Sequence, residues 1–112
     1  MNGLQVAPAE LEAMLLQHGD IADVAAAGIT IDGQEWPRAY VVLQDTSKGK
    51  ISPNDIQDWI KTRAAKHKWL HGGVVFIDAV PKLASGKIQR KILRKWVQDD
   101  AKNLNTSPKA RL

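Results

Sequence analysis

A lysine that follows a glycine stands between two predicted elements of this chain, in the stretch VPKLASGKIQRKILRKW, residues 80–96. Ser85 and Gly86 precede Lys87, and a glycine tolerates positive φ and lets another group approach the backbone closely. A lysine ammonium is a compact charge on a flexible stem, which suits contact with a phosphate oxygen. The pattern indicates a lysine that contacts an anion; the simpler alternative is a solvated turn with a surface lysine.

This lysine does not belong to a phosphate-binding P-loop. The spacing G-x-x-x-x-G-K-[ST] is absent, and Ile88 occupies the position of the hydroxyl residue. The formal net charge of the 112 residues is +4, and residues 82–95 carry lysines and arginines without any acidic residue. A local basic strip suits a phosphate-bearing small ligand as well as a nucleic acid, so both kinds of partner stay open on charge alone.

The composition is that of an ordinary globular domain with one modest core. Apolar residues make up 44% of the chain and charged residues 25%. There are no cysteines, which excludes disulfides and thiolate metal sites. The three histidines, His18, His67 and His71, form no plausible cluster with nearby carboxylates, so no metal site is predicted. No apolar run approaches the roughly 20 residues that a membrane-spanning helix needs.

Hydrophobic periodicity predicts the elements that position the lysine. They are a short extended piece over 3–6, a helix from Pro8 to near Gly19, strands over 21–29 and 38–45, a helix after Ser52, a strand over 74–80, and a helix that ends near residue 100. The expected fold is a small two-layer α+β domain. Its three-stranded sheet consists of an antiparallel hairpin plus a third strand, in the order α-β-β-α-β-α.

Two local signals fix the starts and turns of these elements. Asp32-Gly33 is the strongest two-residue hairpin signal, and it separates the first two predicted strands. Ser52 followed by Pro53 indicates an N-cap with proline in the first helical turn. We expect residues 1–102 to form one domain and residues 103–112 to form a flexible tail with little to pack against.

The lysine loop and the helix after it resemble the carboxy-terminal signature of the acyl-adenylate-forming superfamily, P-K-x-x-x-G-K-[IL]-x-R-x-x-L-R. That superfamily includes 4-coumarate–CoA ligases, acyl-CoA synthetases, luciferases and the adenylation domains of peptide synthetases. The matching positions are Pro81, Lys82, Gly86, Lys87, Ile88, Arg90, Leu93 and Arg94. The stretches GLQVAPAELE and GGVVFIDAVPK are most similar to the 4-coumarate–CoA ligase-like branch.

The resemblance implies that this chain is the carboxy-terminal lid of an AMP-forming carboxylic acid–CoA ligase. A large amino-terminal domain of the same enzyme would bind ATP, Mg²⁺ and the acid. Lys87 would enter that site as the catalytic lysine and contact the carboxylate and the α-phosphate oxygens while the acyl-adenylate forms. Ser85 and Gly86 would support the lysine within the loop. These 112 residues by themselves are expected to be inactive.

The resemblance also implies a second orientation, in which the domain rotates and Lys87 leaves the site. Gly3 and Leu4 would then help to form the tunnel through which the CoA thiol attacks. Gln5 matches a glutamine near the adenylate phosphate, and Lys68 lies where relatives contact the CoA nucleotide. Arg90 or Arg94 is expected to pair with acidic residues at the domain interface.

Two alternative functions remain to be weighed against an acid–CoA ligase. An adenylation domain of a peptide synthetase shares the signature. A small basic module that binds nucleic acid or a protein would need exposed aromatic residues among the basic ones, and only Trp69 and Tyr40 could serve. The ordered motif match favours the adenylate-forming superfamily, and therefore no nucleic-acid partner is predicted.

The last three residues, Ala110, Arg111 and Leu112, resemble Ser-Lys-Leu, the peroxisomal address that an import receptor reads at a carboxy-terminus. They follow a polar stretch that contains Pro108, which would hold them clear of the fold. We therefore expect a peroxisomal enzyme, with the cytoplasm as the alternative location.

Overall fold

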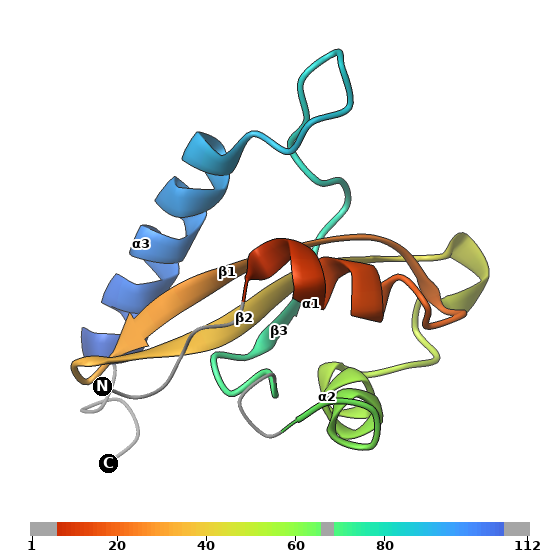
Figure 1. The fold of residues 1–112 in the computed structure, drawn as a ribbon, viewed down its shortest axis with the longest axis horizontal. Helices are drawn as coiled ribbons and strands as arrows, with labels where there is room; N and C mark the ends of the chain where they lie inside the picture. The colour runs from red at the N-terminus through yellow and green to blue at the C-terminus, as the bar shows by residue number, and fades with distance from the viewer. Residues whose placement is uncertain (1–6, 66–68, 107–112) are drawn as a thin grey trace.

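The computed structural model describes residues 7–65 and 69–106. Its elements are α1 (Pro8–Leu15), β1 (Ile21–Ile31), β2 (Gln34–Leu43), the 3-10 helix η1 (Asp45–Ser47), α2 (Pro53–Lys61), β3 (Val74–Phe76) and α3 (Arg90–Thr106). Figure 1 shows the three strands side by side, with α3 crossing on the side away from α1 and α2. The predicted α+β class and the order α-β-β-α-β-α are confirmed.

β1 and β2 form the predicted antiparallel hairpin, which turns at Asp32-Gly33 with φ values of 53° and 82°. Two successive positive φ values are the signature of the two-residue hairpin turn that this dipeptide predicts. β2 begins at Gln34, earlier than the predicted residue 38. The carbonyl of Pro37 faces the other edge of β2, where it accepts from Gly72 N, so the missing N–H of this proline costs no bond to β1.

β3 pairs with β2 in parallel, so the sheet is mixed and has the order β1-β2-β3. The strand stops at Phe76, whereas the apolar run predicted a strand to residue 80. Val80 is buried with Leu93 of α3 instead of pairing in the sheet. The run over 74–80 is therefore apolar for two reasons: its first part pairs in the sheet, and Val80 near its end packs against α3.

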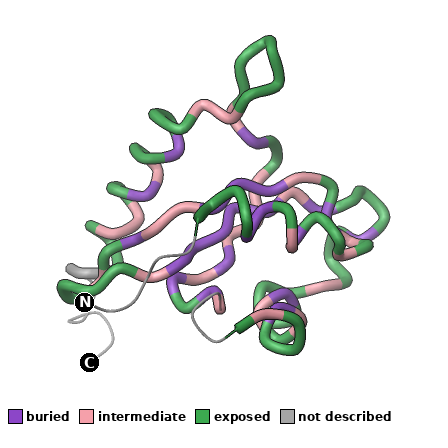
Figure 2. The backbone as a smooth tube through the Cα atoms, in the orientation of Figure 1, coloured by how far each residue is buried: buried purple, intermediate pink, exposed green. Residues whose placement is uncertain are grey.

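The sheet is the middle of three layers, and not one of two as the sequence predicted. One buried cluster lies on the face that α1 and α2 cover; it contains Leu11, Leu15, Val24, Ala26, Val41, Ile56 and Ile60. The other lies under α3 and contains Ala25, Ile29, Tyr40, Val80, Leu93 and Val97. In Figure 2 the buried parts of the tube run along the strands, and the helices are buried only on their inner sides. Strands that are covered on both faces carry mostly apolar residues, as β1 does between Val24 and Ile29.

The start of α2 agrees with its sequence signal, whereas the end of α3 lies beyond the predicted residue. Ser52 Oγ accepts from the backbone N–H of Asp55 at 3.2 Å, and the Asp55 carboxylate accepts from Ser52 N at 2.8 Å. This capping box confirms the predicted N-cap. α3 continues to Thr106, so the predicted start of the tail at residue 103 falls inside the helix. Ala101 packs against the second cluster, which gives this part of α3 a partner that periodicity did not identify.

A buried arginine joins α3 to the sheet. Arg38 of β2 donates to the Tyr40 hydroxyl at 3.1 Å, to Gly72 O at 2.6 Å and to the Asp100 carboxylate at 3.0 Å. The Tyr40 hydroxyl donates to the same Asp100 oxygen at 2.7 Å. Burial, reinforced by this bond to Asp100, raises the pKa of Tyr40 to about 12.

No helix in the described part of the chain is long and apolar enough to cross a membrane.

The pKa of Tyr40 can be measured directly, because Tyr40 is the sole tyrosine of the chain. A raised pKa stabilises the fold below the unfolded value of about 10, and this contribution is lost as the pH rises toward 12. We expect the tyrosinate absorbance of the folded protein to appear near pH 12 or together with unfolding, and near pH 10 in urea. A midpoint near 10 while circular dichroism shows an intact fold would contradict the buried hydrogen bond.

Gly72, just before β3, is expected to be intolerant of any side chain. A Cβ on Gly72 would lie 2.6 Å from Ile29 Cγ2 and 2.6 Å from the backbone oxygen of Pro37. Gly72→Ala should therefore lower the free energy of unfolding by about 1–3 kcal/mol, measured by urea denaturation. Gly19→Ala is the matched control, since a Cβ there meets nothing within 4 Å. Equal stability of the two variants would show that Gly72 lies less close to Ile29 and Pro37 than described.

Candidate functional site

Lys87 lies at the neck of a small β-hairpin, here called the lysine hairpin (residues 82–88), between β3 and α3. Lys82 and Ile88 form an antiparallel bridge. Leu83 N donates to Lys87 O at 2.8 Å, and Gly86 N donates to Leu83 O at 2.8 Å. This is the pattern of a three-residue hairpin loop that closes on a residue with positive φ.

Gly86 is the residue with positive φ, at 93°. A side chain there would meet no atom within 4 Å, so the requirement for glycine comes from the backbone conformation and not from lack of space. Ser85 Oγ lies 3.5 Å from the Lys87 backbone nitrogen, as a long hydrogen bond. Ser85, Gly86 and Lys87 therefore belong to one hairpin, and Gly86 adopts a backbone conformation that glycine tolerates.

The lysine hairpin projects from the body of the domain. Figure 1 shows it as the loop that extends furthest from the sheet, just before α3, and Figure 2 shows it exposed. Each residue from Lys82 to Lys87 is exposed. An ammonium group held out in this way can enter a site on another body and stabilise negative charge there.

Two ion pairs hold the base of this hairpin. One is made with Asp23 of β1, and the other with Glu12 of α1, which is itself hydrogen-bonded to β1. The ammonium of Lys82 lies 2.6 Å from the Asp23 carboxylate. On the other side, Arg90 donates to both oxygens of Glu12, at 2.9 Å and 3.1 Å. Glu12 Oε2 also accepts from the backbone N–H of Ala26 at 2.8 Å, and Arg90 Nη1 donates to the carbonyl of Ala26 at 3.2 Å.

The acids that hold the hairpin base were not identified from the sequence. Arg90 or Arg94 was expected to pair with acidic residues at an interface with another domain. Arg90 pairs with Glu12 inside this one, and Arg94 is exposed. A signal existed, because Glu12 lies on the same face of α1 as Leu11 and Leu15 and is buried with them. A glutamate on an apolar helix face needs a cation nearby, although the sequence does not say which one.

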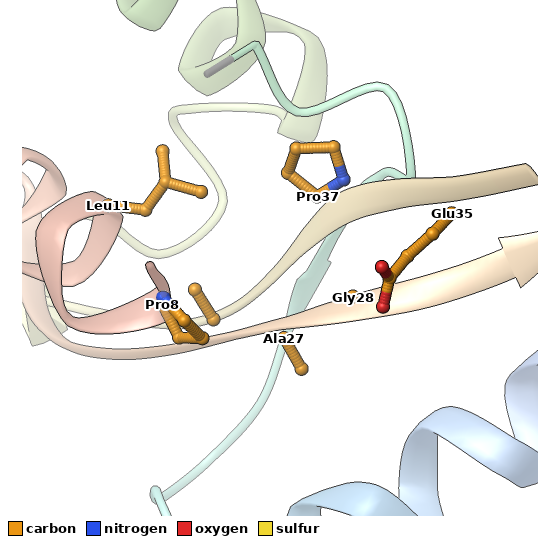
Figure 3. Close-up of a pocket in the computed structure, with 7 residues that line it drawn as sticks. Pro8, Leu11, Ala27, Gly28, Glu35 and Pro37 are labelled. Carbon is orange, nitrogen blue, oxygen red and sulfur yellow. The ribbon is translucent and has the colours of Figure 1, made fainter. Parts of the chain in front are cut away.

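A pocket of about 140 Å³ lies between α1 and the middle of β1. It is lined by Pro8, Leu11, Ala26, Ala27, Gly28, Glu35 and Pro37. Figure 3 shows the Glu35 carboxylate lying over Gly28, with Pro8 and Leu11 on the other side. Glu35 is the single ionisable residue among the described residues that line it, so the pocket lacks the convergent polar groups of a catalytic site. Candidate chemistry therefore rests on the lysine hairpin.

Several predicted site residues lie outside the described residues. They are Gly3, Leu4, Gln5, Lys68, Ala110, Arg111 and Leu112. Trp69, expected at the surface, is half-buried, and its indole N–H donates to Ala64 O at 3.2 Å. Tyr40 is buried and cannot stack on a nucleic-acid base. Within residues 7–65 and 69–106, no group of three or more histidine or acidic side chains is placed to hold a metal ion.

Comparison with known proteins gives the family of this fold and hairpin. Residues 10–87 match the family model described as AMP-binding enzyme C-terminal domain. This match covers most of the chain. It includes both the ion-paired Glu12 and the catalytic candidate Lys87.

Named relatives of this chain are enzymes that carry a similar segment. It is 47% identical over 96 residues to the acyl-CoA ligase azaF of Aspergillus niger, which covers 83% of this chain and 17% of the relative. It is 45% identical over 95 residues to a luciferin 4-monooxygenase of Luciola mingrelica, with 83% and 17% covered. A benzoate CoA ligase from Burkholderia xenovorans LB400 superimposes with a TM-score of 0.72 at 36% identity, over 83% of this chain and 19% of that one.

The chain thus spans less than a fifth of the length of each of these relatives. The family model, the curated relatives and the solved structure agree with one another. The chain belongs to the AMP-binding enzyme C-terminal domain family.

Proposed function

We propose that this domain is the carboxy-terminal part of an ATP-dependent carboxylic acid–CoA ligase, in which Lys87 is the catalytic lysine of acyl-adenylate formation. The observation that carries the proposal is the exposed lysine hairpin, whose Lys87 stands outside the pocket between α1 and β1. The relatives named as CoA ligases favour this function over the adenylation domain of a peptide synthetase.

In the first half-reaction, a carboxylate oxygen of the acid attacks the α-phosphorus of ATP, and pyrophosphate leaves. Negative charge is redistributed over the α-phosphate oxygens in the transition state. The Lys87 ammonium, placed against those oxygens and the carboxylate, stabilises the transition state more than the ground state, and this difference accelerates the step. ATP, Mg²⁺ and the acid are bound by the large amino-terminal domain in this proposal.

In the second half-reaction, the CoA thiol attacks the carbonyl carbon of the acyl-adenylate, and AMP leaves. We assign this step to a second orientation of the domain, in which Lys87 has moved away. Gly3 and Leu4 then form part of the tunnel for CoA, Lys68 contacts a CoA phosphate, and Gln5 lies near the adenylate phosphate. These four roles rest on the matched sequence stretches alone.

Replacement of the lysine should separate the two half-reactions. In the full-length ligase, Lys87→Ala should slow adenylation at least ~10²-fold, the scale of losing one transition-state contact. Thioester formation from supplied acyl-adenylate should change far less. Pyrophosphate release measures the first step, and thioester yield measures the second. Lys91→Ala is the matched control, because Lys91 is another exposed lysine just after the hairpin.

Equal loss in both half-reactions would contradict the two-orientation mechanism. An unchanged rate of adenylation would contradict the role of Lys87 itself. The 112-residue chain alone should release no pyrophosphate from ATP with any carboxylic acid, since the proposal places both substrates on another domain. Turnover by the purified chain would show that this division between domains is wrong.

We further propose that the ligase is imported into peroxisomes through Ala110-Arg111-Leu112. The support is the sequence of this tripeptide and its polar, proline-containing approach. A fluorescent protein that ends in residues 101–112 should give punctate peroxisomal fluorescence, and deletion of Leu112 should make the signal diffuse. Diffuse fluorescence with the intact segment, or puncta that persist without Leu112, would refute the assignment.

A further inference from the structure

Packing of the hairpin does little to fix the position of Lys87 relative to the sheet, because Ile88 at the base is the one hairpin residue that packs against a buried cluster. Every residue from Lys82 to Lys87 is exposed, and none of them belongs to either buried cluster. The internal hydrogen bonds of the hairpin fix its shape but not its direction. Its direction depends on the residues at its base, where the chain returns to the body of the domain.

The stronger connection at this base is made by Arg90, in the first turn of α3. Its guanidinium reaches three acceptors at once: both oxygens of Glu12 and the carbonyl of Ala26. The Glu12 side chain is 10% exposed, and it is fixed in turn by the backbone N–H of Ala26. Glu12, Arg90 and the Ala26 peptide therefore form a closed set of bonds that joins α1, β1 and α3.

Arg90 is not needed to hold α3 on the sheet. Leu93 and Val97 are buried against Ala25, Ile29 and the other residues of the second cluster. Further along the helix, Asp100 is bound by Arg38. These contacts dock the helix further along its length. At the hairpin base, Lys82 is paired with Asp23 and Ile88 packs against the second cluster, and Arg90 adds the multidentate contact that fixes the geometry of the first turn of α3.

A lysine at position 90 would retain the charge and lose the geometry. The planar guanidinium donates in a fixed fork that matches a carboxylate, whereas an ammonium is a point charge on a flexible stem. A lysine could reach one Glu12 oxygen, but it would not bind both oxygens and the Ala26 carbonyl in one arrangement. Arg90→Lys therefore keeps the positive charge at position 90 and changes the geometry of its contacts.

We propose that Arg90 and Glu12 are positioning residues for Lys87, which set the direction in which the lysine hairpin presents its ammonium. This inference rests on the proposed function, in which Lys87 acts on the acyl-adenylate. Neither residue touches the reacting atoms. Their effect is on catalysis through Lys87, because a misplacement of about 1 Å at a reacting centre can cost ~10²-fold in rate.

The test is Arg90→Lys in the full-length ligase. We expect kcat for adenylation to fall at least ~10-fold, with KM for ATP and for the acid changed by less than about 2-fold. Thioester formation from supplied acyl-adenylate, and the melting temperature, should stay close to those of the unchanged enzyme. Glu12→Gln should behave in the same way. Arg63→Lys is the matched control, an exposed arginine just after α2 that lies over the Trp59 ring, and should leave both half-reactions unchanged.

A double-mutant cycle separates positioning from a general structural role. If Arg90 acts through Lys87, Arg90→Lys should cause no further loss of adenylation in an enzyme that already carries Lys87→Ala. Additive losses, or a loss that extends equally to thioester formation, would overturn the inference. So would a normal adenylation rate in Arg90→Lys when Lys87→Ala is impaired, and that result would leave the proposed function intact. A normal rate in Lys87→Ala itself would overturn both.

Discussion

β1 is the strand on which the other elements depend. β2 pairs with it, α1 covers one of its faces and α3 covers the other, and Asp23 and Ala26 receive the ion-paired base of the lysine hairpin. Because both faces are covered along its centre, β1 is apolar from Val24 to Ile29, and the alanines there let a helix approach from either side. A larger side chain at Ala25 or Ala26 would displace one of these helices.

β1 is also the outer strand of the sheet, so its outward peptide groups need partners. At Ala26 these partners are side chains: Glu12 accepts from the N–H and Arg90 donates to the carbonyl. Burying a carboxylate is costly unless it is paired and hydrogen-bonded. A buried ion pair adds little net stability over an apolar pair of the same shape, and its distinct contribution is a fixed geometry.

α3 is held by an arginine–carboxylate pair at two points along its length. In one, Arg90 of the helix binds Glu12; in the other, Asp100 of the helix binds Arg38 of β2. Arg38 also binds the carbonyl of Gly72, just before β3. The helix and the sheet therefore form one rigid unit. For a domain that is proposed to deliver a lysine into a site on another domain, such rigidity transmits the position of the whole body to the ammonium group.

Local features followed from the sequence because they depend on neighbouring residues. The turn at Asp32-Gly33, the cap at Ser52 and the positive φ of Gly86 were predictable, since each depends on the intrinsic conformational or hydrogen-bonding preferences of one or two residues. The order of helices and strands followed from periodicity, and the lysine signature gave the family. The short β3 and the long α3 were not predictable, because apolar residues look alike whether they pair in a sheet or pack on a helix.

The partners of the charged residues were decided by the tertiary structure alone. Glu12 and Arg90 are far apart in the chain, and the sequence offers many acids and bases that could have paired in their place. Only the crossing of α1 and α3 over opposite faces of β1 brings these two together at Ala26. The sequence therefore determined that a lysine would stand on a glycine-containing loop, whereas the fold determined the direction in which that lysine points, because direction depends on contacts between distant segments.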